Sequence, residues 1–322
     1  MALKIAFLWH MHQPYYKNLA DNSYLLPWVR LHALKDYYGM VALLRGFPKI
    51  RQNFNIVPSL LTQLQDYAEE NARETMLDLS LKAVSNLEES DKSYLLRYFF
   101  YANKDHMISR FPRYLELLEK RGLQGTVHDM ERARSRFTMQ DYLDLQVIQK
   151  LAWMDEEYLE SDPAIARLVE KGKHFEESDK LILRSKELEL IRRIIPEYKE
   201  AAARGQVELS TSPFYHPILP LLISPRIAKE SNPHTQIPVA ELLKPEDARV
   251  QIQRAVSFHE KTFGEKPLGC WPSEGAVSEQ ILPLLIEAGF QWIATDEEIL
   301  LRSIEKGPVP EKAKWCATNL YV

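Results

Sequence analysis

The sequence predicts an α/β fold in which parallel strands form a barrel. Short apolar runs that suit buried strands alternate with helical patterns in both terminal parts of the chain. Strand, helix and strand follow one another between residues 268 and 296, which is the spacing of a parallel unit. Polar residues also follow these strands where each one ends, as they do around the site of a parallel barrel. A chain of 322 residues with 45% hydrophobic residues is long enough for such a barrel in one domain.

Composition and charge exclude several classes of function. The formal net charge is −4, and we find no long basic stripe, so we expect no nucleic-acid partner. The two cysteines, Cys270 and Cys316, form neither a disulfide framework nor a pair with zinc-ligand spacing. The N-terminal run LKIAFLWH is shorter than the apolar region of a signal peptide, and no run reaches the ~18 apolar residues of a membrane span. We therefore expect a soluble cytoplasmic protein that does not bind membranes.

The first predicted strand covers residues 3 to 9 and leads into two histidines. Pro14 cannot donate to a sheet ladder, so the strand ends before it. His10 and His12 are two residues apart and point to the same side of an extended chain. They are either a metal pair or hydrogen-bond donors to a substrate. The structural alternative is a hydrogen-bonded pair that closes the end of a barrel.

Helices dominate the middle of the chain. Residues 28 to 44 follow a helical pattern, a short strand is predicted at 55 to 58, and another helix begins at about residue 60. Residues from about 66 to 204 are rich in Glu, Lys, Arg and Leu and poor in strand signals. We interpret them as a helical insertion whose charges form ordinary solvated faces. Trp153 within it is expected in the core.

A third strand is predicted at residues 207 to 212. Gly205 suits the left-handed turn after a helix, and apolar residues then alternate with polar ones. Glu208 lies within this strand, and His216 follows among prolines. A polar barrel interior would explain both residues. The alternative is that Glu208 pairs with a local arginine in the core.

The stretch GCWPSEG follows a predicted helix at 245 to 263 and a strand at 268 to 271. An exposed loop at the end of that strand would present Glu274 as a nucleophile and Trp271 as a stacking surface for a sugar ring. The structural alternative is that Trp271 fills the core and Glu274 caps the next helix, because carboxylates favour the first helical turn.

The next helix is predicted at 279 to 288, and a strand at 290 to 296 follows it with Asp296 at its carboxyl end. Polar groups thus follow at least four predicted strands. Because the carboxyl ends of parallel strands meet at one end of a barrel, we expect these groups to converge there.

Four of these motifs resemble, in order and spacing, those of glycoside hydrolase family 57. They are HMHQPYY, GQVELSTSPFYHPILPLL, GCWPSEGAVS and FQWIATDEEIL. The resemblance implies a retaining enzyme that acts on α-glucans, as α-amylases, amylopullulanases, 4-α-glucanotransferases and branching enzymes do. It also implies a seven-stranded (β/α) barrel, often followed by a helical domain, and it implies no cofactor.

The resemblance also implies roles for individual residues. Glu274 matches the catalytic nucleophile of the family. Positions that line the sugar site are matched by His10, His12, Gln13, Glu208, His216, Trp271 and Asp296. No metal ligand is expected among them.

One family motif has no counterpart here. The general acid/base of the family is an aspartate in a later motif, and no segment after Asp296 resembles it. We therefore expect residues 1–322 to be a single barrel domain that is incomplete at its C-terminus and lacks the last strands and the C-terminal helical domain. Such a chain would turn over natural α-glucans slowly or not at all, because general acid/base help is worth roughly 10²- to 10⁴-fold in rate.

Two other functions stay open on the residues alone. A metal-dependent polysaccharide deacetylase would use the histidine pair with a third ligand, which HMHQP does not supply locally. A non-catalytic glucan-binding module would need no acid/base. Metal analysis separates the first alternative from a glycosidase, and activity on an activated glycoside separates the second.

Overall fold

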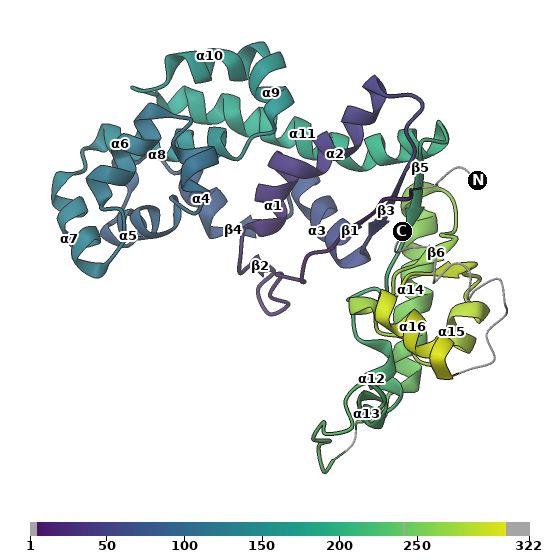
Figure 1. The fold of residues 1–322 in the computed structure, drawn as a ribbon. Coiled ribbons are helices and arrows are strands. Elements are labelled where there is room, and N and C mark those ends of the chain that lie inside the picture. Colours follow the sequence, from purple (N-terminus) through teal and green to yellow (C-terminus); the bar gives the residue numbers. More distant parts are fainter. Residues whose placement is uncertain (1–4, 241, 307–322) are drawn as a thin grey trace. The chain divides into compact units, whose positions relative to one another are not determined.

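A computed structural model describes residues 5–240 and 242–306, with the side chains of residues 304–306 left aside (Figure 1). Contacts within the chain divide it into two compact units. The first unit comprises Met1–Pro14, Arg51–Leu61 and Val207–Val322. The second comprises Tyr15–Ile50 and Thr62–Gln206. The sequence-based expectation of one domain stays a prediction.

Parallel strands form the centre of the first unit. A three-stranded sheet has the order β1 (Leu8–Met11), β3 (Gln52–Ile56) and β5 (Val207–Ser210), and a pair consists of β6 (Gly269–Cys270) and β7 (Trp292–Ile293). A parallel bridge between Thr211 and Cys270 joins the two sheets. The Thr211 amide donates to the Gly269 carbonyl at 3.2 Å. The five strands therefore follow one another in sequence order, and within the described residues they form an open sheet, not a closed barrel.

The register places polar residues of neighbouring strands side by side. His10 of β1 is opposite Asn55 of β3, and Asn55 is opposite Ser210 of β5. Because side chains alternate along a strand, opposite residues point to the same face of the sheet. In the neighbouring pair of strands, Gly269 of β6 lets the Trp292 ring of β7 approach its backbone closely. A Cβ atom at Gly269 would lie 2.0 Å from that ring.

Helices pack beside the strands of the first unit. Its helical segments are the start of α3 (Pro58–Ala68), α12 (Leu219–Ile223), η5 (Pro225–Ile227), α13 (Ala228–Ser231), α14 (Pro245–Phe263), η6 (Ser273–Gly275), α15 (Leu282–Glu287) and α16 (Glu297–Lys306). Pro245 occupies the first turn of α14, where its missing N–H costs nothing, and Gly264 ends the helix in a left-handed conformation. Buried apolar residues from α12, α14, β6 and α15 form one hydrophobic cluster. This cluster supports the loop that follows β6.

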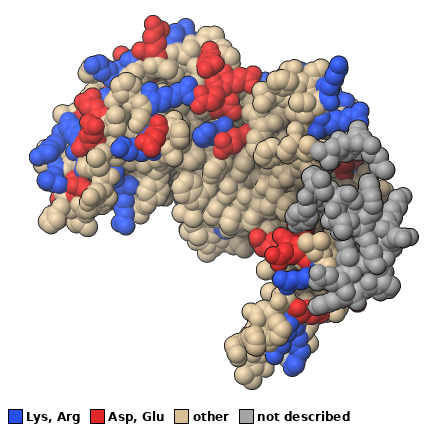
Figure 2. All heavy atoms as spheres, in the orientation of Figure 1, with Lys and Arg blue, Asp and Glu red and all other residues tan. Residues whose placement is uncertain are grey.

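The second unit is almost entirely helical. Its strands β2 (Ser23–Tyr24) and β4 (Arg73–Glu74) pair in parallel. Its helices are α1 (Trp28–His32), η1 (Ala33–Tyr37), α2 (Tyr38–Ala42), η2 (Leu43–Gly46), α4 (Thr75–Leu81), η3 (Val84–Asn86), α5 (Glu89–Tyr98), η4 (Lys104–Ile108), α6 (Pro112–Arg121), α7 (Val127–Arg136), α8 (Met139–Ala152), α9 (Glu156–Ser161), α10 (Pro163–Lys171) and α11 (Glu177–Ala203). Capping boxes begin α5, α7, α8 and α11. Blue and red side chains are interspersed over this unit in Figure 2, as expected for solvated helix faces.

A buried ionic network lies inside the second unit. Arg30 donates to both carboxylate oxygens of Glu74, at 2.7 and 3.0 Å. Lys150 donates to Glu187 at 2.6 Å, and both side chains are fully buried. Arg30 also approaches Glu187 at 3.6 Å, so the two pairs form one cluster. Buried charges need such partners, because an isolated ion loses its hydration without compensation.

The architecture confirms the main predictions and corrects some boundaries. The α/β class with parallel strands is confirmed, and the region from 66 to 204 is helical apart from the two-residue strand β4. Of the strand predicted at residues 3–9, residues 3 and 4 lie outside the described residues, and β1 begins at Leu8, where β3 first supplies a pairing partner. The helix predicted from residue 279 begins at Leu282, with Pro283 in its first turn. Trp153 is buried as expected.

No helix in the described part of the chain is both long enough and apolar enough to cross a membrane.

Candidate functional site

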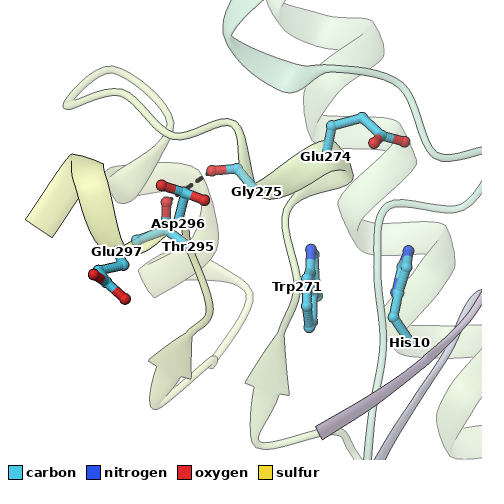
Figure 3. Close-up of a pocket in the computed structure, with 7 residues that line it drawn as sticks. All are labelled: His10, Trp271, Glu274, Gly275, Thr295, Asp296 and Glu297. Atoms are coloured by element: carbon cyan, nitrogen blue, oxygen red, sulfur yellow. Dashed lines mark hydrogen bonds between the residues drawn. The ribbon is translucent and has the colours of Figure 1, made fainter. Parts of the chain in front are cut away.

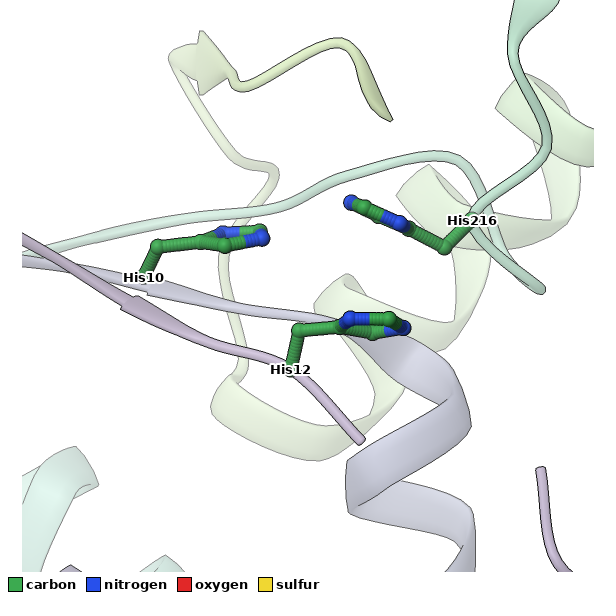
Figure 4. Close-up of side chains that lie close together, drawn as sticks. All are labelled: His10, His12 and His216. Carbon is green, nitrogen blue, oxygen red and sulfur yellow. The ribbon is translucent and has the colours of Figure 1, made fainter. Parts of the chain in front are cut away.

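Three histidines from separate segments meet in the first unit. His10 lies in β1, His12 directly follows that strand, and His216 lies in the loop between β5 and α12. The ring centroids are 5.8 Å apart for His10 and His12, 5.2 Å for His10 and His216, and 4.0 Å for His12 and His216. In Figure 4, the ring nitrogens of His10 and His216 point toward the space between the two residues. The side chains predicted to share one face of the first strand therefore do so, and His216 joins them.

Asn55 fixes the orientation of His10. The His10 Nδ1 atom lies 2.7 Å from the Asn55 Oδ1 atom. Ser212 also donates to this oxygen, at 3.0 Å, and the Asn55 amide group donates to Ser210 at 3.3 Å. Since Asn55 Oδ1 only accepts, His10 Nδ1 carries the proton, and His10 Nε2 is left with a lone pair.

His216 combines a strained backbone with a buried ring. Its φ angle of 58° lies in the left-handed region, which is unfavourable for a residue with a Cβ atom. Its side chain is only 4% exposed, and among the described residues its Nε2 atom has no hydrogen-bond partner. Its Nδ1 atom lies 3.7 Å from Glu274 Oε1. Strain and an unsatisfied buried atom at one residue are typical of a functional site.

The site keeps the three imidazoles neutral. Burial is the largest cause of the lowered pKa of each ring, because the charged form loses hydration. The neighbouring His10 lowers the pKa of His12 further, and both rings together with burial lower the pKa of His216 to about 3. The Glu274 carboxylate opposes the shift at His10 and His12. Each ring at pH 7 therefore offers one N–H donor and one lone pair.

Glu274 stands at the edge of a pocket next to these rings. It follows β6 in η6 and has a φ angle of 57°, so it too adopts a left-handed conformation. Its side chain is 69% exposed. Trp271, which directly follows β6, stacks on His10 with ring centroids 4.8 Å apart and an angle of 20° between the planes. The turn therefore presents a carboxylate beside an aromatic surface, as Figure 3 shows.

The pocket has a volume of about 360 Å³ and extends from the His10 ring to the segment after β7. Its lining residues are His10, Trp271, Glu274, Gly275, Thr295, Asp296 and Glu297. Thr295 donates to the Gly275 carbonyl at 2.8 Å and ties the two loops together. Asp296 accepts the Glu298 amide at 2.8 Å, which caps the start of α16. Three carboxylates, those of Glu274, Asp296 and Glu297, thus line one pocket of a size suited to a small ligand.

Four of the predicted site residues do not line this pocket. His12 and His216 belong to the histidine cluster beside it, and Glu208 and Gln13 lie outside both groups. Glu208 is the second residue of β5, lies exposed, and accepts a hydrogen bond from Trp292 Nε1 at 2.7 Å. It pairs with Asn53, so it lies two residues nearer the amino end of the strands than Ser210, which is level with His10. Gln13 is half-buried, and its main-chain carbonyl accepts a hydrogen bond from Ser59 at 3.0 Å.

Sequence reasoning missed Asn55, Ser212, Thr295 and Glu297. The signal for Asn55 was present, because it is a polar residue flanked by Phe54 and Ile56 in an apolar strand. What the sequence lacks is the register that places Asn55 opposite His10. Thr295 and Glu297 are sequence neighbours of the predicted Asp296, so the prediction of polar residues at strand ends applies to them as well.

The histidine cluster also has the composition of a metal site. One ring nitrogen from each of the three residues can be chosen so that all three lie within 4.8 Å of one another. The sequence-based prediction that no residue binds metal rests on the local HMHQP segment, whereas His216 lies about 200 residues further along the chain.

Comparison with known proteins identifies the family. Residues 6–321 match the family model described as glycosyl hydrolase family 57. The α-amylase AmyC from Thermotoga maritima is 14% identical with a TM-score of 0.47, over 94% of this chain and 41% of that chain. A family 57 branching enzyme from Thermococcus kodakaraensis is 18% identical with a TM-score of 0.42, over 89% of this chain and 38% of that chain. The 4-α-glucanotransferase from Thermococcus litoralis is 14% identical with a TM-score of 0.39, over 96% and 24% of the respective chains.

The chain therefore spans about two fifths of the length of the first two of these solved structures. No curated protein sequence matches it. The family match extends over nearly the whole chain and includes every motif that carries the site: the chain belongs to glycosyl hydrolase family 57.

Proposed function

We propose that this chain carries the nucleophile and part of the sugar site of a retaining enzyme that hydrolyses or transfers α-glucans. The observation that carries the proposal is the exposed Glu274 carboxylate at a pocket edge, beside Trp271 and within 3.7 Å of a neutral, buried His216. Family membership narrows the chemistry to glycosidic bonds. The names of the neighbouring structures, an α-amylase, branching enzymes and a 4-α-glucanotransferase, suggest α-glucans as the substrate class.

Glu274 supplies the attacking oxygen in this mechanism. Its carboxylate forms a bond to the anomeric carbon, while the bond to the leaving group breaks and its electron pair departs with that group. The product is a glycosyl ester on Glu274, which water or a second sugar then opens. The exposure of Glu274 suits a group that must reach the substrate.

The neighbouring rings bind and orient the sugar. Trp271 offers an aromatic face to the apolar face of a pyranose, and its stack on His10 holds that face in place. Neutral His12 and His216 each combine a donor with an acceptor, which matches sugar hydroxyl groups. Asp296 lines the same pocket and would accept hydrogen bonds from the sugar. We assign Gln13 and Glu208 to more distant parts of the substrate site.

A retaining enzyme also needs an acid/base carboxyl about 5 to 5.5 Å from its nucleophile. The family resemblance gives that role to an aspartate of a later motif. None of the motifs described above matches that later motif. We therefore propose no acid/base role for Asp296 or Glu297, although both line the pocket with Glu274.

We also propose that the protein acts in the cytoplasm. A low cysteine count fits a reducing compartment, and the one described cysteine, Cys270, is a buried free thiol.

The test is covalent labelling. The reagent is an α-glucosyl fluoride with a second fluorine on the ring, which leaves without protonation and slows hydrolysis of the adduct. Mass spectrometry should find one glycosyl group on the peptide that contains Glu274 in the wild type and none in Glu274→Gln. Glu279→Gln is the matched control, because Glu279 is an exposed carboxylate outside the pocket lining, and it should label like the wild type.

Equal labelling of Glu274→Gln would refute the nucleophile assignment. No labelling of a wild-type chain that is folded by circular dichroism would refute the glycosidase proposal and favour a glucan-binding module.

A further inference from the structure

The three histidines have an arrangement that sugar binding alone does not require. Hydrogen bonds to hydroxyl groups do not need three ring nitrogens within 4.8 Å of one another. Such convergence is what a metal ion requires, and neutral imidazole is a preferred ligand of Zn²⁺. We propose that His10, His12 and His216 bind a divalent transition metal ion, best represented by Zn²⁺, beside the sugar pocket that His10 lines.

The distances allow the site to form with small movements. Tetrahedral Zn²⁺ with Zn–N bonds of about 2.0 to 2.1 Å places its ligand nitrogens about 3.4 Å apart. Because all three nitrogens lie within 4.8 Å of one another, no separation must shrink by more than about 1.4 Å, which is within the range of side-chain rotation. His10 and His12 lie on the same side of one strand end, so both already approach from a common direction (Figure 4).

The surroundings of His10 match those of a metal ligand. Metal-binding histidines donate their second ring N–H to a carbonyl or carboxylate, which fixes the tautomer. His10 Nδ1 does this toward Asn55 Oδ1 at 2.7 Å, and buried Ser212 holds Asn55 in turn. The His10 Nε2 lone pair is therefore fixed in direction before any ligand arrives.

His216 supplies the second independent observation. Its side chain is 96% buried, and its Nε2 atom has no hydrogen-bond partner among the described residues. A buried polar atom without a partner is rare in folded proteins and calls for an explanation. A metal ion between the three rings would satisfy one nitrogen of this ring, and Glu274 Oε1 lies 3.7 Å from the other.

The proposed ion would act against the proposed glycosidase. Three protein nitrogens leave the fourth position of Zn²⁺ open. The Glu274 carboxylate is the nearest anion to His216 and would be attracted to that position. Because a carboxylate bound to a cation is a poor nucleophile, Zn²⁺ should inhibit glycosyl-adduct formation and compete with the sugar for the pocket.

Binding is tested directly with metal alone. Isothermal titration of the wild-type chain with Zn²⁺ should show one ion per chain, and Co²⁺ should give the visible absorption of a tetrahedral site. His216→Asn should weaken binding at least tenfold, and asparagine tolerates the left-handed backbone at this position. His12→Ala should weaken it similarly. His128→Ala is the matched control, because His128 is 91% exposed on α7, and it should bind like the wild type.

Two results would overturn the proposal. One is wild-type affinity for Zn²⁺ in both His216→Asn and His12→Ala, which would place the ion elsewhere. The other is no stoichiometric binding of Zn²⁺ or Co²⁺ to the folded wild type. Glu274→Gln separates this proposal from the proposed function, because it should lose adduct formation while the three histidines still bind Zn²⁺.

Discussion

Asn55 connects the fold of the first unit to its site, and its replacement tests that connection. Its side chain is fully buried and takes part in three hydrogen bonds. They join it to His10 at 2.7 Å, to Ser212 at 3.0 Å and to Ser210 at 3.3 Å. Asn55→Ala removes all three bonds at once and leaves the strand backbone, which pairs β1 and β5, unchanged.

The expected loss of stability follows from the hydrogen bond that each partner of Asn55 loses. A net hydrogen bond contributes about 1 kcal/mol, and a buried group left without a partner costs about 1–3 kcal/mol. Ser210 and Ser212 are both buried, so their hydroxyl groups have no access to water as a substitute. His10 lines the open pocket and can be solvated. We therefore expect Asn55→Ala to lower the free energy of unfolding by about 2–4 kcal/mol.

Urea unfolding at pH 7 measures this loss, with Asn53→Ala as the matched control. Asn53 lies two residues earlier on the same strand and faces the same side. Its side chain donates one long bond of 3.4 Å, to the Phe7 carbonyl, so the control should lose no more than about 0.5 kcal/mol.

The site should respond as well. Without Asn55, the His10 ring is free to rotate and to change tautomer, so it no longer supports the Trp271 stack in one geometry. The rate of glycosyl-adduct formation should fall at least about tenfold, which corresponds to about 1.4 kcal/mol. Equal stability and equal labelling rates for Asn55→Ala and Asn53→Ala would refute the reasoning.

Two further predictions concern charges in the second unit. Glu187→Gln should lower the free energy of unfolding by about 3–5 kcal/mol in urea titrations, because it leaves the buried Lys150 ammonium without its charged partner at 2.6 Å. Replacement of both residues by apolar ones of similar volume should lower it less, because no unpaired charge then stays buried. Burial raises the pKa of Asp141, but hydrogen bonds, led by that from Lys120, outweigh it and hold the pKa at about 2. A carboxyl group with a lowered pKa stabilises the fold at pH values above its ordinary pKa of 3.8, and this stabilisation is lost as the pH falls toward 2. Asp141→Asn should therefore lower the free energy of unfolding by about 1–2 kcal/mol at pH 7 and by little at pH 2. Glu116→Gln, at an exposed carboxylate, is the control and should show no such pH dependence.

Local patterns account for the parts of the structure that the sequence predicted well. A short apolar run, a helix pattern and a Gly or Pro boundary are all properties of neighbouring residues, and they located β5 and α14 closely. The strand predicted at residues 55–58 overlaps β3 only at its end, because Pro58 already begins α3. The same holds for the positions of His10, His12, Trp271 and Glu274 at strand ends. Each depends only on where its own strand stops.

Register is not a local property, and the differences arise from it. The sequence predicts Glu208 and His10 in one site because both belong to strands that lead into it. The pairing of Glu208 with Asn53 moves it two residues toward the amino end of the sheet, where it binds Trp292 instead. The same register brings Asn55 opposite His10, a contact between residues 45 positions apart. Neither relation can be read from one strand alone.

The backbone conformation at the site also cannot be predicted from neighbouring residues, because the surrounding structure enforces it. His216 and Glu274 both have φ angles near 57°, a region that glycine occupies without cost and that strains residues with a Cβ atom. Glycine at either position would relieve that strain but remove the imidazole or the carboxylate. The fold therefore holds two chemically active side chains at positions where glycine would be conformationally easier, and it brings them within 3.7 Å of each other. Strain of this kind persists only when the surrounding structure enforces it, as the β6 loop does through Trp271 and the Thr295–Gly275 bond. This coincidence of strain and proximity supports a functional role for both residues, whether the site holds a sugar, a metal ion or each in turn.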